Sequence, residues 1–240
     1  MNRISKIHLA VLTLALLALG SCKGGGGPTS PTPEPLDINQ LDTYGFTTNG
    51  QVVRFTVGAN VNFYIASGEG VSGWSPGLES AAARQMTAWN DVGDKWGIYH
   101  VSQTEKSSNG DVRVVWVDSL GGNAAGRTSF QAQGGRLILP ILIELPTHVN
   151  GRTVSQSEVA LAAVHEMGHA LGLWQHSPYS GDVMYPIAMN GVPSKRDRNT
   201  IYKLYNTAAH ITNAVREPSA ASGEPIVTYS IECGADCIGR

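Results

Sequence analysis

Residues 155–172 read SQSEVALAAVHEMGHALG, and this stretch carries its own start and stop signals for a helix. Ser155 and Glu158 have the spacing of a capping box, in which each side chain accepts a hydrogen bond from the backbone N–H of the other residue. Gly172 stands where a glycine commonly ends a helix. The sequence therefore predicts a helix from residue 156 to residue 171.

His165 and His169 lie four residues apart on this predicted helix, so both imidazoles project from one face and can bind one metal ion. Glu166 is rotated by roughly 100° from His165, off the ligand face but within reach of a water on the metal. Two neutral nitrogens and a carboxylate base are what a hydrolytic zinc site requires. The competing interpretation is a solvent-facing histidine pair that flanks a glutamate.

The pattern continues beyond the predicted helix. Residues 165–176 read HEMGHALGLWQH, and residues 177–186 read SPYSGDVMYP. This sequence resembles the metzincin zinc peptidases, and within them the matrixin-like group, whose pattern HExxHxxGxxH is followed by a turn that contains Met. The resemblance covers about residues 50–206.

The resemblance implies an α+β fold of the metzincin type. Its sheet is twisted and mostly parallel with an antiparallel edge strand, and it packs against the active-site helix and two further helices. The resemblance also implies one catalytic zinc ion, with Glu166 as general base for a metal-activated water and Met184 as a hydrophobic floor beneath the ion. Such a domain would be a zinc metalloendopeptidase that hydrolyses peptide bonds of a protein or peptide substrate.

The third metal ligand is the point at which the chain departs from the family pattern. That pattern places its third histidine where this chain has Gln175, and His176 follows one residue later. Imidazole is a far better zinc ligand than a neutral amide, and a loop can absorb one extra residue. We therefore assign His176 as the third ligand. A two-histidine site completed by water and a degenerate site without metal are the alternatives.

In the family's fold, the edge strand above the cleft pairs with the substrate backbone, which is β-augmentation. We place that strand at five consecutive residues, Gly126, Arg127, Thr128, Ser129 and Phe130. Matrixins often carry a second, structural zinc bound by several histidines in the strand region. We expect no such site, because His148 is the only histidine between residues 102 and 151. The sequence leaves a structural calcium ion open.

Other segments predict the rest of one α/β unit. Ser75 and Pro76 favour a helix start, and that helix would bury Ala82, Met86 and Trp89 on one face. Residues rich in Val, Ile, Phe and Tyr predict strands at 51–57, 60–66, 98–102, 111–117, 126–130 and 136–143. Pro140 lacks an N–H, which predicts an edge, a bulge or a break within the last of these strands.

The first 36 residues predict export and anchoring. Residues 1–21 combine a basic start with an apolar run that is too short to span a bilayer comfortably, as in a lipoprotein signal peptide. The sequence ending at Cys22 resembles a bacterial lipobox, which implies cleavage before this cysteine and its acylation. Residues 22–36, rich in Gly and Pro, would form a tether. The alternative is ordinary secretion with Cys22 unmodified.

The remaining features define the expected organisation. We expect a monomeric, exported lipoprotein held at the outer membrane or cell surface by its lipid, or released from it. The peptidase domain would cover residues 37–215, and 216–240 would form a tail in which Cys233 and Cys237 suggest a small disulfide loop. The formal net charge of −2 over 240 residues gives no electrostatic case for nucleic-acid binding.

Two other functions fit the same residues. The chain could keep the fold as a non-catalytic surface lipoprotein that serves as a binding module, or it could be a zinc hydrolase that acts on something other than peptides. Metal analysis separates the first from the peptidase. A substrate panel with a chelator control separates the second.

Overall fold

The computed structural model describes residues 37–234. The predicted signal peptide, the tether, Cys22 and Cys237 lie outside the described residues. Within the described part, no helix combines the length and the apolar character needed to cross a membrane.

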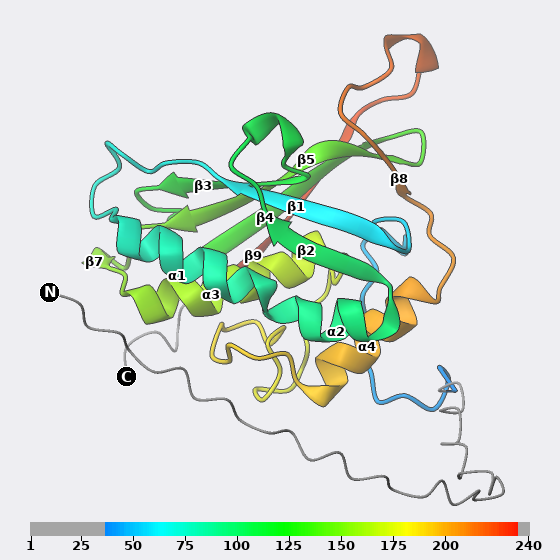
Figure 1. Cartoon of the computed structure of the whole chain (residues 1–240), viewed down its shortest axis with the longest axis horizontal. Helices are drawn as coiled ribbons and strands as arrows, with labels where there is room; N and C mark the ends of the chain where they lie inside the picture. The colour runs from blue at the N-terminus through cyan, green and yellow to red at the C-terminus, as the bar shows by residue number, and fades with distance from the viewer. Residues whose placement is uncertain (1–36, 235–240) are drawn as a thin grey trace, which may run out of the picture. The chain divides into compact units, whose positions relative to one another are not determined.

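One mixed β-sheet forms the framework of the domain (Figure 1). Its main path runs in the order β2-β1-β3-β5-β4-β9, and β8 pairs with β5 beside that path. The strands are β1 (Ala59–Ile65), β2 (Tyr99–Gln103), β3 (Val112–Val117), β4 (Ala124–Gln133), β5 (Arg136–Pro146), β8 (Thr212–Val215) and β9 (Val227–Gly234). A separate hairpin joins β6 (His148–Val149) to β7 (Arg152–Thr153).

The direction of the strands confirms the predicted α+β fold. β2, β1, β3, β5 and β8 pair in parallel, whereas β4 is antiparallel to β5 and β9 is antiparallel to β4. The sheet is therefore mostly parallel, with antiparallel strands at one edge.

The helices cover one face of this sheet (Figure 1). They are α1 (Pro76–Met86), α2 (Asn90–Trp96), α3 (Gln156–Ala170) and α4 (Lys195–Tyr205), with the 3-10 turn η1 (Thr87–Trp89) between α1 and α2. Two further 3-10 turns, η2 (Ser107–Asn109) and η3 (Ala220–Ser222), lie in connections between strands. Alternate side chains of β1 point to the covered face, because Val61, Phe63 and Ile65 are buried and their neighbours are less so. The predicted buried face is confirmed, since Ala82 and Met86 of α1 and Trp89 of η1 are all buried.

Two strand predictions have informative outcomes. Residues 51–57 form only isolated bridges, at Gln51 and Val53, so the predicted strand is wrong. Their apolar side chains reflect packing in the core and not pairing in the sheet, since Val52, Val53 and Phe55 are buried. Pro140 lies inside β5 at an irregularity in the pairing with β4, which is the bulge that its missing N–H predicted.

The boundary at residue 215 is also wrong, because residues 227–234, which we had placed in a tail, form strand β9 of the main sheet. The signal was present in the sequence. Tyr229, Ile231 and Cys233 alternate with polar residues at the period of a strand. Cys233 is a buried free thiol here.

Candidate metal centre

Helix α3 brings His165 and His169 into the interior. Its first turn is closed by the predicted capping box, in which Ser155 and Glu158 bind each other's backbone N–H. Its middle is held by Trp89 of η1, whose Nε1 donates to the Val164 carbonyl at 2.8 Å. Both histidines are fully buried as a result.

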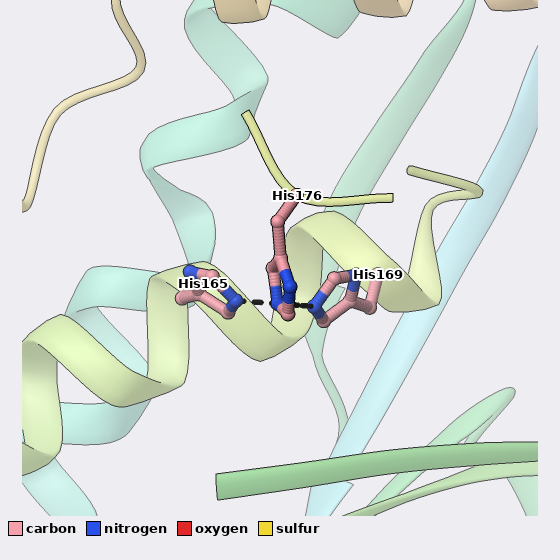
Figure 2. Close-up of side chains that lie close together, drawn as sticks. All are labelled: His165, His169 and His176. Carbon is pink, nitrogen blue, oxygen red and sulfur yellow. Dashed lines mark hydrogen bonds between the residues drawn. The ribbon is translucent and has the colours of Figure 1, made fainter. Parts of the chain in front are cut away.

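Three imidazoles converge at this point (Figure 2). The Nε2 atoms of His165 and His169 are 3.0 Å apart, and the Nε2 of His176 lies 3.3 Å from that of His169. His176 reaches the pair from the loop after α3 and is only partly buried. The structure thus brings together the three residues that the sequence assigned as metal ligands.

The second nitrogen of each buried ring fixes its tautomer. Nδ1 of His165 donates to the Val183 carbonyl at 2.8 Å, and Nδ1 of His169 donates to the Leu173 carbonyl. Burial lowers the pKa of His165 to about 3, and burial also lowers the pKa of His169 well below its usual value, so both rings are neutral. Each Nε2 therefore carries a lone pair directed at the other ring.

Two facing lone pairs repel each other unless a cation lies between them. Neutral imidazole is also the form that binds zinc, and hydrogen bonds from Nδ1 to carbonyls orient such ligands. Burial lowers the pKa of His176 as well, which keeps the third ring available. The chemistry of the three side chains therefore fits a zinc ion.

Gln175 points away from the three histidines. Its Nε2 donates to the Thr47 carbonyl at 2.9 Å, and a Cβ added to Gly45 would meet its amide oxygen. The side chain is thus held against the segment before β1. Of the two candidates, His176 therefore faces His169 and Gln175 does not, and the role of His176 as a metal ligand remains a prediction.

Glu166 is fully buried on the side of α3 that faces β4. Thr128 Oγ1 lies 2.5 Å from its Oε2, while within the described chain Oε1 has no partner of good hydrogen-bond geometry. A Cβ added to Gly126 would lie 2.6 Å from Oε1, so the strand can approach the carboxylate only because this residue is a glycine.

The pKa of Glu166 reflects this enclosure. Burial raises the pKa to about 7, and the thiol and backbone N–H of Cys233, together with the Thr128 hydroxyl, oppose that rise. The sequence did not identify Cys233 as part of this region. Its Sγ lies within 4.8 Å of both a Glu166 oxygen and a His165 nitrogen.

The Met-containing turn lies directly against α3. A Cβ at Gly168 would be 2.3 Å from the Met184 sulfur, so this methionine is packed onto the helix between the two histidine positions. Asp197 holds the turn, since its carboxylate accepts the Val183 N–H at 2.8 Å and the hydroxyl of Tyr44 at 2.8 Å. Asp197 was not singled out from the sequence, although its position in the α4 capping box was a local signal.

This packing predicts that Gly168→Val destabilises the domain by about 2 kcal/mol, because Met184 and Trp89 leave no room for a side chain. The matched control is Gly181→Ala in the neighbouring loop, where an added Cβ meets no atom. Urea unfolding monitored by tryptophan fluorescence measures the difference. Equal urea midpoints of unfolding for both variants would contradict the prediction, because they would show that Met184 moves aside without loss of stability.

The predicted substrate-binding edge strand needs a correction. Residues 126–130 lie in β4, as expected for a strand above the site, but β4 is not the edge of the sheet. β9 pairs along its outer side over residues 124–132. The sequence alone does not specify which distant strands pair, so it did not predict β9 as the partner of β4.

Residues 147–206 match the sequence profile of the matrixin family. No curated protein sequence matches the chain.

The solved structures that are similar to the chain include the following two. Myroilysin has 13% identity and a TM-score of 0.40, with 69% of this chain and 95% of that protein covered. Metalloproteinase-II from Bacteroides fragilis has 14% identity and a TM-score of 0.40, with 70% of this chain and 59% of that protein covered. Through residues 147–206, which hold the three histidines and Met184, the chain resembles the matrixins, a family of zinc metallopeptidases.

Proposed function

We propose that this chain is a zinc-dependent endopeptidase, with His165, His169 and His176 as metal ligands and Glu166 as general base. One observation carries the proposal. The Nε2 atoms of the buried, neutral imidazoles of His165 and His169 face each other at 3.0 Å, and Nε2 of His176 lies 3.3 Å from that of His169. The match of residues 147–206 to the matrixins supports zinc as the ion and a peptide or protein as the substrate.

A zinc ion held by three imidazoles supplies positive charge that polarises a carbonyl and makes a nearby water more acidic. Glu166 would take the proton of that water on its carboxylate and pass it to the leaving amine. Burial raises the pKa of Glu166 to about 7 in the metal-free chain, and the charge of a bound zinc ion would lower it and favour the carboxylate that accepts a proton. Thr128 positions the carboxylate through its contact with Oε2.

The role of Thr128 can be tested through the pH dependence of kcat/KM. Thr128→Val removes a hydrogen bond that favours the charged carboxylate, so the pKa of Glu166 should rise further. A base is active when deprotonated, and the acidic limb of the profile should therefore move to higher pH, by about one unit. Thr128→Ser keeps the hydroxyl and should retain the original limb. An unmoved limb in the valine variant would contradict this positioning role.

Metal removal tests the proposed function itself. The chain is incubated with a denatured protein and a mixed peptide library, with and without a chelator, and zinc content is measured in parallel. After release of β9 as described below, we expect cleavage that the chelator abolishes and added zinc restores. Cleavage that resists chelation would contradict the metal mechanism. Bound zinc without any cleavage, also after release of β9 as described below, would favour the non-catalytic binding module.

We also propose that the chain is exported and anchored by a lipid on Cys22, on the strength of the lipobox-like sequence. Metabolic labelling with palmitate in a bacterial host should label the wild type and not Cys22→Ala. The labelled protein should sediment with membranes. An unlabelled wild type found only in the soluble exported fraction would favour ordinary secretion.

A further inference from the structure

Strand β9 occupies the outer side of β4 along most of its length, and Figure 1 shows β4 and β9 within the same sheet. The pairing is antiparallel and places Glu232 opposite Arg127 and Tyr229 opposite Phe130. A peptide that binds by β-augmentation needs the unpaired N–H and C=O groups of an edge strand. β4 offers none of these groups on the stretch that β9 covers.

The last described residues of β9 reach the candidate metal centre. Cys233 pairs with Gly126, the glycine that contacts Glu166, and the Cys233 thiol lies within 4.8 Å of a Glu166 oxygen. On the opposite side, the Gly234 N–H donates to the Pro186 carbonyl at 2.7 Å, just after the Met-containing turn. An extended segment of the chain thus passes between β4 and the turn, beside the proposed base.

β9 contributes one fully buried side chain to the core, and Tyr229 and Ile231 pack against the core while partly exposed. Within this strand, all of which is described, only Cys233 is buried, and Val227 is 43% exposed. β4 already covers α3 with its own buried side chains, Thr128, Phe130 and Ala132. β4 thus packs on α3 through its own side chains, and β9 is an additional strand beside it. Backbone pairing and a few side-chain contacts hold β9 in place.

One of those side-chain contacts is an ion pair at the surface, and the other reaches the buried ring of Phe130. Arg127 Nη2 is 2.6 Å from Glu232 Oε1, and the Tyr229 ring stacks on Phe130 with centroids 4.5 Å apart. The connection that leads into β9, residues 216–226, is almost entirely exposed. A strand of this kind can leave β4 without exposing a large part of the core.

We propose that β9 is an intramolecular occupant of the peptide-binding edge of β4, so that the intact chain is latent until β9 is displaced. The functional consequence rests on the proposed peptidase activity, but the occupancy of the edge does not. An incoming peptide would compete with β9 for the same backbone groups of β4. Cys233, at the position nearest to Glu166, stands where the central part of that peptide would lie.

The first test weakens β9 within the full chain. Glu232→Arg places a positive charge opposite Arg127, which disfavours the pairing of β9 with β4. Glu217→Arg makes the same charge change in the exposed connection outside β9 and serves as the control. Binding of an extended peptide that ends in a zinc-chelating hydroxamate is measured by calorimetry on zinc-loaded protein. We expect roughly three- to tenfold tighter binding for Glu232→Arg and no change for the control.

The second test releases β9. A site-specific protease sequence replaces residues 219–224, and the cut chain is separated from its C-terminal fragment. In the intact chain, the tether keeps β9 at an effective concentration of about millimolar next to β4. Cutting the tether and removing the fragment abolishes this competition, so the hydroxamate should bind at least about tenfold more tightly than to the intact chain. A synthetic peptide of residues 227–240 should reverse the gain. Equal affinity of intact and cut protein for the hydroxamate would overturn the proposal.

A final readout needs no metal and therefore separates this inference from the proposed function. A labelled peptide of residues 227–240 is bound to the cut chain in the presence of chelator and challenged with the peptide part of the hydroxamate. Displacement supports competition for the edge of β4. If the labelled peptide stays bound at a saturating concentration of competitor, the proposal that both bind the edge of β4 is overturned. A chain that binds no zinc would instead contradict the proposed function, and this would be seen in the zinc content and not in the displacement.

Discussion

Glu166→Gln is expected to reduce kcat/KM for peptide hydrolysis by about 100- to 10,000-fold while zinc stays bound. The amide has the size of the carboxylate and can still accept the Thr128 hydroxyl, but it cannot take a proton from water. The loss should therefore appear in turnover and not in the fold. Peptide cleavage and elemental analysis of the same samples measure both quantities.

The matched control for this experiment is Glu105→Gln. Glu105 is exposed and lies in a turn remote in sequence from the proposed site, and its removal makes the same change in charge. It should keep the activity of the parent chain. Both variants are best compared after release of β9, so that latency does not mask the difference. A Glu166→Gln variant with undiminished turnover would contradict the assignment of the base.

His176→Ala is expected to weaken zinc binding by more than about 100-fold, because removal of groups that only orient a ligand already costs 10- to 100-fold. His165 and His169 would remain as a two-coordinate pair. Gln175→Ala is the control next in sequence, and it should leave zinc affinity unchanged because its amide contacts Thr47. Competition with a chromophoric chelator gives both dissociation constants.

The two variants also address the departure from the family pattern directly. If Gln175→Ala weakened zinc binding and His176→Ala did not, the extra residue in the loop would have been placed wrongly. The domain should remain folded in either case, because neither residue belongs to the buried core. Circular dichroism of both variants verifies this.

The helix that carries the site could be predicted because its signals are local. The capping box at Ser155, the histidine spacing and Gly172 lie within one segment, and the structure places α3 at residues 156–170. Gly172 adopts a φ of 115°, which favours glycine. Short-range backbone and side-chain preferences suffice for such an element. The start of α1, with Pro76 in its first turn, is a second case.

The surroundings of the site could not be predicted in the same way, because they depend on contacts between distant segments. The contact of Thr128 with Glu166 joins residues 38 positions apart. The anchoring of Gln175 on Thr47 spans 128 positions. The pairing of β9 with β4 likewise joins distant segments, since Arg127 and Glu232 are 105 positions apart.

The edge of the sheet shows most clearly why contacts between distant segments could not be predicted. The residues of β4 were assigned to a strand above the site, and they form one. Whether that strand lies at the edge depends on whether another segment pairs with it, and Cys233 was interpreted only as a disulfide candidate. Alternation at Tyr229, Ile231 and Cys233 would have predicted a strand, but not its partner.

The X-ray absorption spectrum of the zinc-loaded protein tests the central claim most directly. Three imidazoles should appear as nitrogen neighbours at about 2.0–2.1 Å, with the outer-ring scattering typical of histidine. The spectrum of zinc-loaded His176→Ala should show one imidazole fewer around the zinc ion. A protein that retains no zinc, or a zinc shell with fewer than three imidazoles in the parent chain, would contradict the account.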